Sequence, residues 1–259
     1  MKLQAHAVEK PWGREDLPPP FPRAAGGKTG EIWFEPDNGA DLPLLVKYIF
    51  TSERLSVQVH PDDSEAAARG IASGKTECWY IVAAEPGATL GLGVRAGTDA
   101  SALRRSALDG SIVDLMEWKP VAPGDFVYVP AGTVHAIGAG ISLVEIQQNQ
   151  GVTYRLYDYG RPRELHLDDA VAVAKLEPYA ADMARDGRHA GLLVDGAHFT
   201  VAHVIGGQGA AGALAGRDRW IMPLAGEVNG AGVGECLFLH RDERGEASAD
   251  ADFLVASVS

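Results

Sequence analysis

The sequence predicts a mainly β protein, folded as a β-barrel or sandwich. Many short runs of β-branched and aromatic residues are separated by turns rich in Gly and Pro. Few segments have the pattern and caps of helices. The chain has 259 residues, 46% of them hydrophobic and 22% charged, enough for a substantial core in one large or two small domains.

The first part of the chain alternates strands with loops and two short helices. Residues 16–30 contain three consecutive prolines and predict an irregular loop. One helix is expected to run towards Ser73 and another over 98–108. Their candidate N-caps are Asp62, Asp63 or Ser64 for the first and Thr98 or Asp99 for the second. Strands are expected at 44–50, 55–60, 78–83, 89–94, 125–129, 141–149 and 152–157.

Beyond these strands, the β pattern weakens. A short helix over 170–176 bridges to a second region, with strands at 199–205, 220–224, 236–240 and 253–258. We expect a degenerate second barrel there. The predicted domains are therefore 1–165 with the main site, a linker and short helix at 166–189, and a degenerate β domain at 190–259.

Charge and cysteine content restrict the partners and the location. The net charge of −12 argues against a nucleic-acid or membrane partner, so an anionic substrate would need a local cluster of Lys and Arg. No apolar run approaches the roughly 20 residues that cross a bilayer, and no signal peptide is expected at the N-terminus. Cys78 and Cys236 make no disulfide framework and predict buried thiols in a reducing cytoplasm. Nothing in the sequence specifies an oligomeric state.

Residues 124–135 end in a histidine held at a rigid turn. Phe126 to Val129 favour a strand, Pro130 cannot continue a central ladder, and Gly132 permits a tight bend before His135. The spacing G-x5-P-x-G-x2-H resembles the second motif of the cupin superfamily. This resemblance implies a jelly-roll barrel with a metal bound by His135.

Besides His135, a pair of polar residues is expected inside the barrel. Side chains alternate along a strand, so Gln58 and His60 share one face, opposite Leu55, Val57 and Val59. Buried polar groups are costly unless they bind something, and a metal would satisfy both. The first cupin motif usually has His-x-His here, where this chain has Gln-x-His. The motif's glutamate then corresponds to Glu77.

These residues form a candidate metal-binding set. Two imidazoles, one carboxylate and one amide oxygen suit a borderline divalent ion such as Zn²⁺. The set has no thiolates, unlike a structural zinc clip, and could add a water or substrate oxygen as a fifth ligand. Either histidine alone could instead be an ordinary hydrogen-bonded residue. The histidines at 6, 166, 189, 198, 203 and 240 lack ligand spacing and are expected at the surface or in packing.

Several motifs resemble those of the type I phosphomannose isomerases. The resemblance covers roughly residues 8–165, is weaker at the N-terminal motifs, and thins after 190. The motifs are Leu55–Asp63, Gly74–Tyr80, Pro130–Ile137, Glu145–Gln148 and Thr153–Asp158, with weaker matches at Lys10–Gly13 and Gly30–Trp33.

The resemblance implies an aldose–ketose isomerase that interconverts mannose 6-phosphate and fructose 6-phosphate through a cis-enediol(ate). It implies one Zn²⁺ per chain. Gln58, His60, Glu77 and His135 match the zinc ligands, and Lys47, Lys75, Glu145 and Arg155 match active-site residues.

The catalytic base is left open among three residues: Lys47, Lys75 and Glu145. A lysine must be neutral to accept a proton, and burial near Zn²⁺ is expected to lower the pKa of Lys47. Alternatively, Lys47 extends its head into solvent. Lys75 and Arg155 could instead hold phosphate or steady the enediolate. A surface ion pair with Asp158 is the alternative for Arg155, and a structural role is the alternative for Glu145.

Other cupin functions compete with this interpretation. One is another metal-dependent enzyme, either an iron dioxygenase or an isomerase of non-phosphorylated sugars. Dioxygenases favour histidine-rich ligand sets, so Gln58 argues against that class. Another is a non-catalytic sugar-binding cupin, which would not require Lys47, Lys75, Glu145 and Arg155 together.

Overall fold

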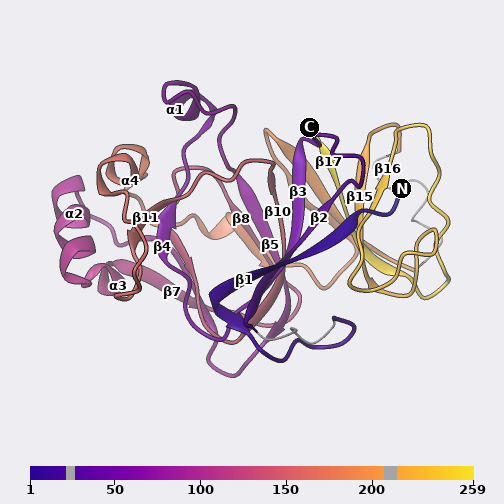
Figure 1. The fold of residues 1–259 in the computed structure, drawn as a ribbon, viewed down its shortest axis with the longest axis horizontal. Helices are drawn as coiled ribbons and strands as arrows, with labels where there is room; N and C mark the ends of the chain where they lie inside the picture. Colours follow the sequence, from indigo (N-terminus) through magenta and orange to yellow (C-terminus); the bar gives the residue numbers. More distant parts are fainter. Residues whose placement is uncertain (22–26, 207–214) are drawn as a thin grey trace.

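A computed structural model describes residues 1–21, 27–206 and 215–259, and shows three antiparallel sheets stacked with short helices. From left to right in Figure 1, the layers are helices, a helix-side sheet, a central sheet and a C-terminal sheet. The helices are α1 (Asp63–Ala67), α2 (Ala100–Asp109), α3 (Ile112–Leu115), α4 (Leu167–Val173) and the 3₁₀ turn η1 (Ala181–Met183).

Each sheet contains strands that are distant in sequence. The central sheet has the order β1 (Gln4–Arg14), β2 (Thr29–Glu35), β3 (Leu44–Phe50), β10 (Ile141–Gln148), β5 (Glu77–Ala84), β8 (Asp125–Val129) and β12 (Ala184–Asp186). The helix-side sheet has the order β11 (Tyr154–Tyr157), β4 (Val57–Val59), β9 (His135–Ile137), β6 (Thr89–Val94) and β7 (Met116–Pro120). The C-terminal sheet has the order β13 (Gly191–Asp195), β14 (Phe199–Ile205), β17 (Asp252–Val258), β15 (Arg219–Ala225) and β16 (Leu237–Leu239).

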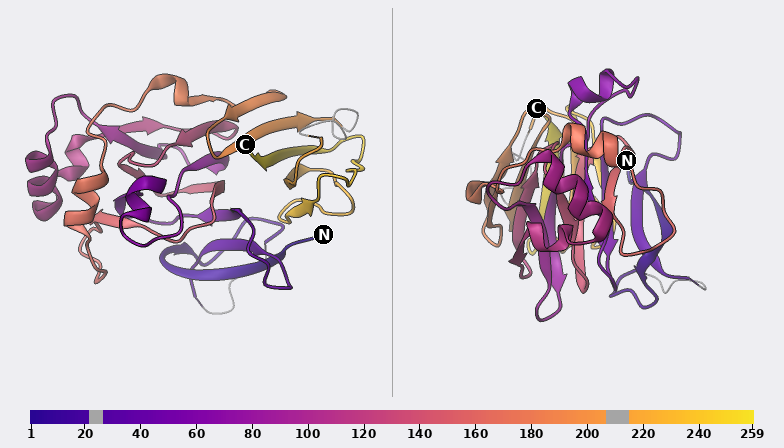
Figure 2. Two further views of the ribbon diagram at one scale, coloured as in Figure 1. Left: turned by 90° about the horizontal axis from the view of Figure 1, so that it is seen from above. Right: turned by 90° about the vertical axis from the view of Figure 1, so that its left-hand side faces the viewer.

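The central and helix-side sheets enclose the barrel core. Trp79 and Ile81 from the central sheet pack with Leu90 and Leu92 from the helix-side sheet, and all four are fully buried. The outer face of the helix-side sheet is covered by α2, α3 and α4, which stand in front of the strands in the right-hand view of Figure 2. This leaves the barrel interior as the place where polar residues can gather away from water.

The central sheet is buried on both faces. Along β3, Tyr48 and Phe50 contact the C-terminal sheet, whereas Ile49 faces the barrel core. Phe199 and Trp220 come from the C-terminal sheet to the same cluster as Tyr48. Burial on both sides explains the nearly continuous apolar run of β3, in which a single charged side chain points into the barrel.

The predicted mainly β fold is confirmed, with several strands at their predicted bounds. β3, β6, β8 and β14 match the expected ranges. The expected strand at 55–60 is shorter, because β4 covers only Val57–Val59. Leu55 therefore lies in the barrel core, and its predicted placement on the face of Val57 and Val59 is wrong.

Other segments differ from the prediction. The predicted loop 16–30 ends earlier than expected, because β2 begins at Thr29; its residues 22–26 lie outside the described part. β1, β2, β7, β12 and β13 were not predicted. The described part of 190–259 contributes one five-stranded sheet, and β12 from the expected linker joins the central sheet. The division into domains stays a prediction.

Two expectations about composition can also be compared with the structure. Cys78 and Cys236 are buried free thiols, as predicted. Among residues 1–21, 27–206 and 215–259, no helix has the length and apolar character needed to span a bilayer.

Candidate metal and substrate site

Three of the four predicted metal-binding residues converge inside the barrel. His60 follows β4, Glu77 begins β5 and His135 begins β9, so both barrel sheets contribute. All three side chains are buried, and their candidate ligand atoms lie within 4.8 Å of one another. The fourth residue, Gln58, is directly opposite His135 in the pairing of β4 with β9.

The two histidines are held so that one nitrogen of each faces Glu77. The Nδ1 atoms lie 2.9 Å from the Val152 carbonyl for His60 and 2.8 Å from the Thr133 carbonyl for His135. A carbonyl can only accept, so each Nδ1 carries the proton and each Nε2 presents a lone pair. Backbone carbonyls commonly orient metal-binding histidines in this way.

The groups that face each other are therefore all acceptors. Each Nε2 lies 3.4 Å from a different oxygen of Glu77. Oε1 of Glu77 is buried and has no hydrogen-bond partner. This oxygen faces the lone pair of His135 without a donor, which is costly unless a cation lies between the two atoms, so the donor set fits a divalent metal ion.

Lys75 supplies positive charge to two of these atoms. Its Nζ lies 2.5 Å from Oε2 of Glu77 and 3.1 Å from Nε2 of His60. Burial raises the pKa of Glu77, but the charge of Lys75 and the contacts with the two histidines lower it well below its usual value. Burial, followed by the charge of Lys75, lowers the pKa of His60 to about 3. Burial also lowers the pKa of His135. Both imidazoles are thus neutral near pH 7, as metal binding requires.

Gln58 lies beside the cluster with its amide nitrogen towards it. Its Oε1 accepts from the Ser56 hydroxyl at 3.0 Å, and its Nε2 lies 3.2 Å from Nε2 of His135. The two ends of an amide are assigned from such hydrogen bonds. A half-turn of this amide would present its oxygen to the cluster.

A pocket lies next to the cluster and contains all four predicted active-site residues. Five cationic and two anionic side chains line it, in a chain whose net charge is −12. The pocket therefore has the local excess of positive charge that an anionic substrate requires. Its charged lining residues are Lys10, Glu31, Lys47, Lys75, Glu145, Arg155 and Arg163.

Lys47 is an ammonium between two carboxylates. Its Nζ lies 2.7 Å from Oε1 of Glu145 and 3.8 Å from Oε2 of Glu31. Burial favours the neutral amine, but the two carboxylates outweigh it, and the pKa of Lys47 is raised. The expected lowering of this pKa concerns Lys47 beside bound Zn²⁺ and stays a prediction. The alternative of a lysine with its head in solvent is wrong, because the side chain is 8% exposed.

Three charged residues of the pocket were missed by the sequence analysis: Lys10, Glu31 and Arg163. Arg163 donates two hydrogen bonds to the buried Asp158, at 2.6 and 2.7 Å. Arg155 instead donates to the Glu164 carbonyl at 3.3 Å, so its alternative pairing with Asp158 is not formed. Asp158 and Arg163 are only five residues apart in the sequence, and this spacing could have suggested their ion pair. Lys10 and Glu31 lie in strands that were not predicted.

Part of the chain is similar in sequence to curated proteins. The chain is 40% identical to the mannose-6-phosphate isomerase of Streptococcus mutans over 169 residues, covering 61% of this chain and 53% of that protein. The chain therefore spans only about half the length of this curated relative. No family model matches the sequence.

Structural similarity extends further. The mannose 6-phosphate isomerase of Bacillus subtilis superposes with a TM-score of 0.77 and 25% identity, covering 98% of both chains. A zinc-bound mannose 6-phosphate isomerase superposes with a TM-score of 0.70 and 14% identity, covering 100% of this chain and 99% of that one. The chain is thus similar, in sequence over part of its length and in fold over nearly all of it, to proteins named mannose-6-phosphate isomerase.

Proposed function

We propose that the protein is a zinc-dependent aldose–ketose isomerase that interconverts mannose 6-phosphate and fructose 6-phosphate. The observation that carries the proposal is the buried His60, Glu77 and His135 cluster, with lone pairs facing one another beside a cationic pocket. The similar proteins reported above are named as isomerases of mannose 6-phosphate, which supports this proposal. Among the cupin alternatives, no feature of the described site favours a dioxygenase or a non-catalytic sugar-binding module.

The metal would be Zn²⁺, held by His60, Glu77 and His135, with Gln58 as a fourth ligand after rotation of its amide. Two imidazoles and one carboxylate form a typical catalytic zinc set. A structural neighbour is a zinc-bound isomerase. When bound, zinc would polarise the substrate oxygens next to the reacting carbons.

The reaction moves one proton from carbon 2 to carbon 1 of the open-chain sugar and a hydroxyl proton from oxygen 2 to oxygen 1. Among the three candidate bases, Glu145 is favoured because Lys47 and Lys75 each contact a carboxylate and serve better as ammonium groups. Oε2 of Glu145 accepts from Trp79 Nε1 at 3.1 Å, which fixes the carboxylate at the pocket wall. In this proposal Glu145 carries the proton, and the two ammonium groups steady negative charge on the sugar oxygens.

Arg155 and Arg163 are proposed to bind the phosphate. Both line the pocket and come from the segment that follows β10. Guanidinium groups match phosphate geometry with paired donors. We further infer a cytoplasmic location, which the two buried free thiols support.

The test is a coupled assay of mannose 6-phosphate isomerisation by zinc-loaded protein, before and after a chelator and after zinc is restored. Activity should vanish with chelation and return with zinc. His135→Ala should lose bound zinc and activity together, because a buried ligand is removed. His240→Ala is the matched control, because that histidine is 66% exposed on its side chain. Turnover that resists the chelator, or zinc-loaded protein without turnover, would refute the proposal.

A further inference from the structure

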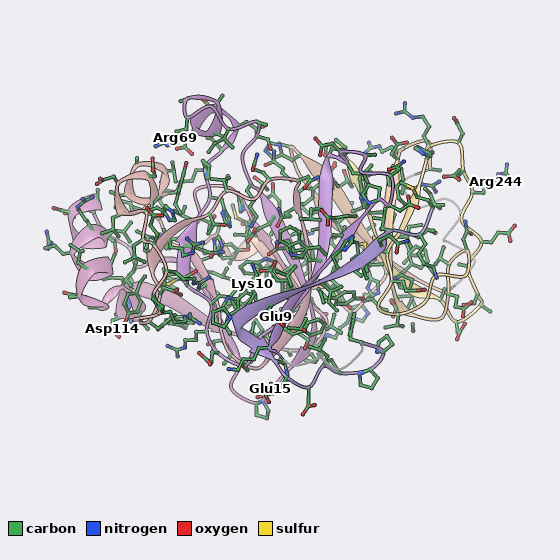
Figure 3. All side chains as sticks on the ribbon, in the orientation of Figure 1. Glu9, Lys10, Glu15, Arg69, Asp114 and Arg244 are labelled. Carbon is green, nitrogen blue, oxygen red and sulfur yellow. The ribbon has the colours of Figure 1, made fainter. Side chains whose placement is uncertain are left out.

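Four charged side chains of alternating sign form a row of contacts across four neighbouring strands of the central sheet, although Glu31 is not directly opposite Lys47 in the strand pairing. Lys10, Glu31, Lys47 and Glu145 come from the neighbouring strands β1, β2, β3 and β10, and all line the same pocket. Lys10, labelled in Figure 3, begins the row on β1. Successive charged atoms are 3.3, 3.8 and 2.7 Å apart along the row. The row thus connects the N-terminal strand with the proposed proton carrier.

Glu31 is the member of this row that has no assigned role. Its side chain is only 10% exposed, so its charge is taken out of water. Trp33 donates its indole N–H to Oε2 of Glu31, and Lys10 Nζ lies 3.3 Å from Oε1. Burial raises the pKa of Glu31, but Lys47 and Lys10 lower it below its usual value. The carboxylate is therefore ionised and held in place from two sides.

The same oxygen that accepts from Trp33 faces Lys47. Oε2 of Glu31 is 3.8 Å from Nζ of Lys47, and the ring of Trp33 lies 5.3 Å from that Nζ. Glu145 approaches Lys47 from the opposite side. The lysine head is thus centred between two carboxylates and over an aromatic face, an arrangement that fixes both its position and its charge.

We propose that Glu31 is a positioning residue, which keeps Lys47 an ammonium beside Glu145 and in line with the substrate oxygens. This inference rests on the proposed isomerase function, because it assigns Lys47 a task in that reaction. An ion pair with a merely structural role would stabilise the fold but leave kcat and its pH profile unchanged.

Other charged groups around Lys47 enter the expected pH dependence. Lys10 and Glu31 face it from β1 and β2, Glu145 from β10, and Glu77 acts on it from β5. Lys75, Arg155 on β11 and Arg163 also line the pocket. Replacing Glu31 by a neutral residue leaves this set more positive, so Lys47 should lose its proton at lower pH.

The experiment measures kcat and KM against pH for the zinc-loaded enzyme and for Glu31→Gln. We expect kcat to fall about tenfold, since small misplacements of a reacting group cost this much or more. The basic limb of the profile should move down by about one pH unit, because one neighbouring carboxylate is lost. KM should change by less than about threefold, because phosphate binding is intact. Bound zinc should be unchanged.

Two further variants separate positioning from folding. Glu31→Asp keeps the charge and should restore the basic limb in part, which also serves if Glu31→Gln folds poorly. Glu35→Gln makes the same change on the same strand at an exposed side chain and should match the wild type. A lower kcat with an unmoved basic limb in Glu31→Gln would overturn the proposal and leave Glu31 a structural residue.

A measurement without turnover distinguishes this inference from the isomerase proposal. Lys47 can be titrated by NMR of protein labelled with ¹³C at the lysine ε carbons, with Lys47→Arg identifying its signal. The Lys47 midpoint should fall by about one pH unit in Glu31→Gln. An unmoved midpoint would reject the role of Glu31 even in an active enzyme. If the wild-type protein shows no turnover but the Lys47 midpoint still falls in Glu31→Gln, only the isomerase function is rejected.

Discussion

At the scale of residues, the site depends on atoms that are held by groups outside it. Backbone carbonyls of Val152 and Thr133 fix the tautomers of the two metal-facing histidines. Asp158 has a similar role for Arg163: its side chain is 1% exposed, and it binds the guanidinium through two hydrogen bonds. The buried carboxylate thus orients a cation at the pocket without contacting the substrate itself.

Arg163→Ala should weaken substrate binding more than turnover. Losing a charge-assisted hydrogen bond to phosphate should raise KM for mannose 6-phosphate by about 10- to 100-fold. The proton-transfer residues are untouched, so kcat should change much less. Steady-state kinetics at fixed ionic strength measures both. Arg105→Ala, at an exposed site on α2, is the control and should leave KM unchanged. An unaltered KM in Arg163→Ala would remove this residue from the phosphate site.

At the scale of elements, the turn between β8 and β9 couples two of the candidate metal-binding residues. Gly132 has a φ of 87°, in the left-handed region that glycine adopts readily. Its N–H donates to the His60 carbonyl at 2.8 Å, and the turn leads directly to His135. The backbone of one ligand strand is therefore bonded to the turn that delivers the other.

Gly132→Ala should lower the free energy of unfolding by about 1–2 kcal/mol, the usual cost of a left-handed residue with a Cβ. The new Cβ would also lie 2.9 Å from the Lys175 side chain, which is flexible and can move. Gly151→Ala is the control, because a Cβ there meets nothing within 4 Å. Urea titrations of the zinc-free proteins provide the measurement. Equal stability of the two variants would show that the turn is not strained.

The same scale shows why some strands were predictable and others were not. β3 and β8 are runs of β-branched and aromatic residues bounded by turn signals, and the sequence pattern defines their bounds. β1 is an edge strand that is exposed over much of its length and contains a proline, so its sequence shows no clean alternation. Lys10 and Glu31 were missed with their strands. The burial of Asp158 also depends on tertiary packing that local sequence does not specify.

The metal-facing residues were easier to identify than their neighbours. His60 and His135 each stand at a strand boundary beside a turn signal, and the resemblance of their spacing to cupin motifs suggests them. The raised pKa of Lys47 was not predictable in this way, because it depends on two carboxylates from different strands. The apolar sequence of β3 indicates that Lys47 is buried. The carboxylates that compensate its charge, Glu31 and Glu145, become apparent only after the strands are paired.

At the scale of the whole molecule, the central sheet is shared by two cores. Its inner face forms the barrel with the site, and its outer face packs on the C-terminal sheet. Cys78 and Tyr80 point outward on β5 and alternate with Glu77 and Trp79, which point to the inner face. The C-terminal sheet therefore stabilises the strands that carry the site, although it supplies none of the residues lining the pocket.

This sharing predicts that the described sheets unfold together. Phe199→Ala removes a fully buried ring from the packing of β14 on the central sheet, and should cost about 3–5 kcal/mol of unfolding free energy. Leu192→Ala, at a side chain that is 55% exposed in the same sheet, should cost much less. We expect one cooperative transition in urea for both variants, followed by tryptophan fluorescence and by far-UV circular dichroism. Two separate transitions, with the site-bearing sheets unaffected by Phe199→Ala, would show that 190–259 folds independently and that the shared sheet does not couple the two cores.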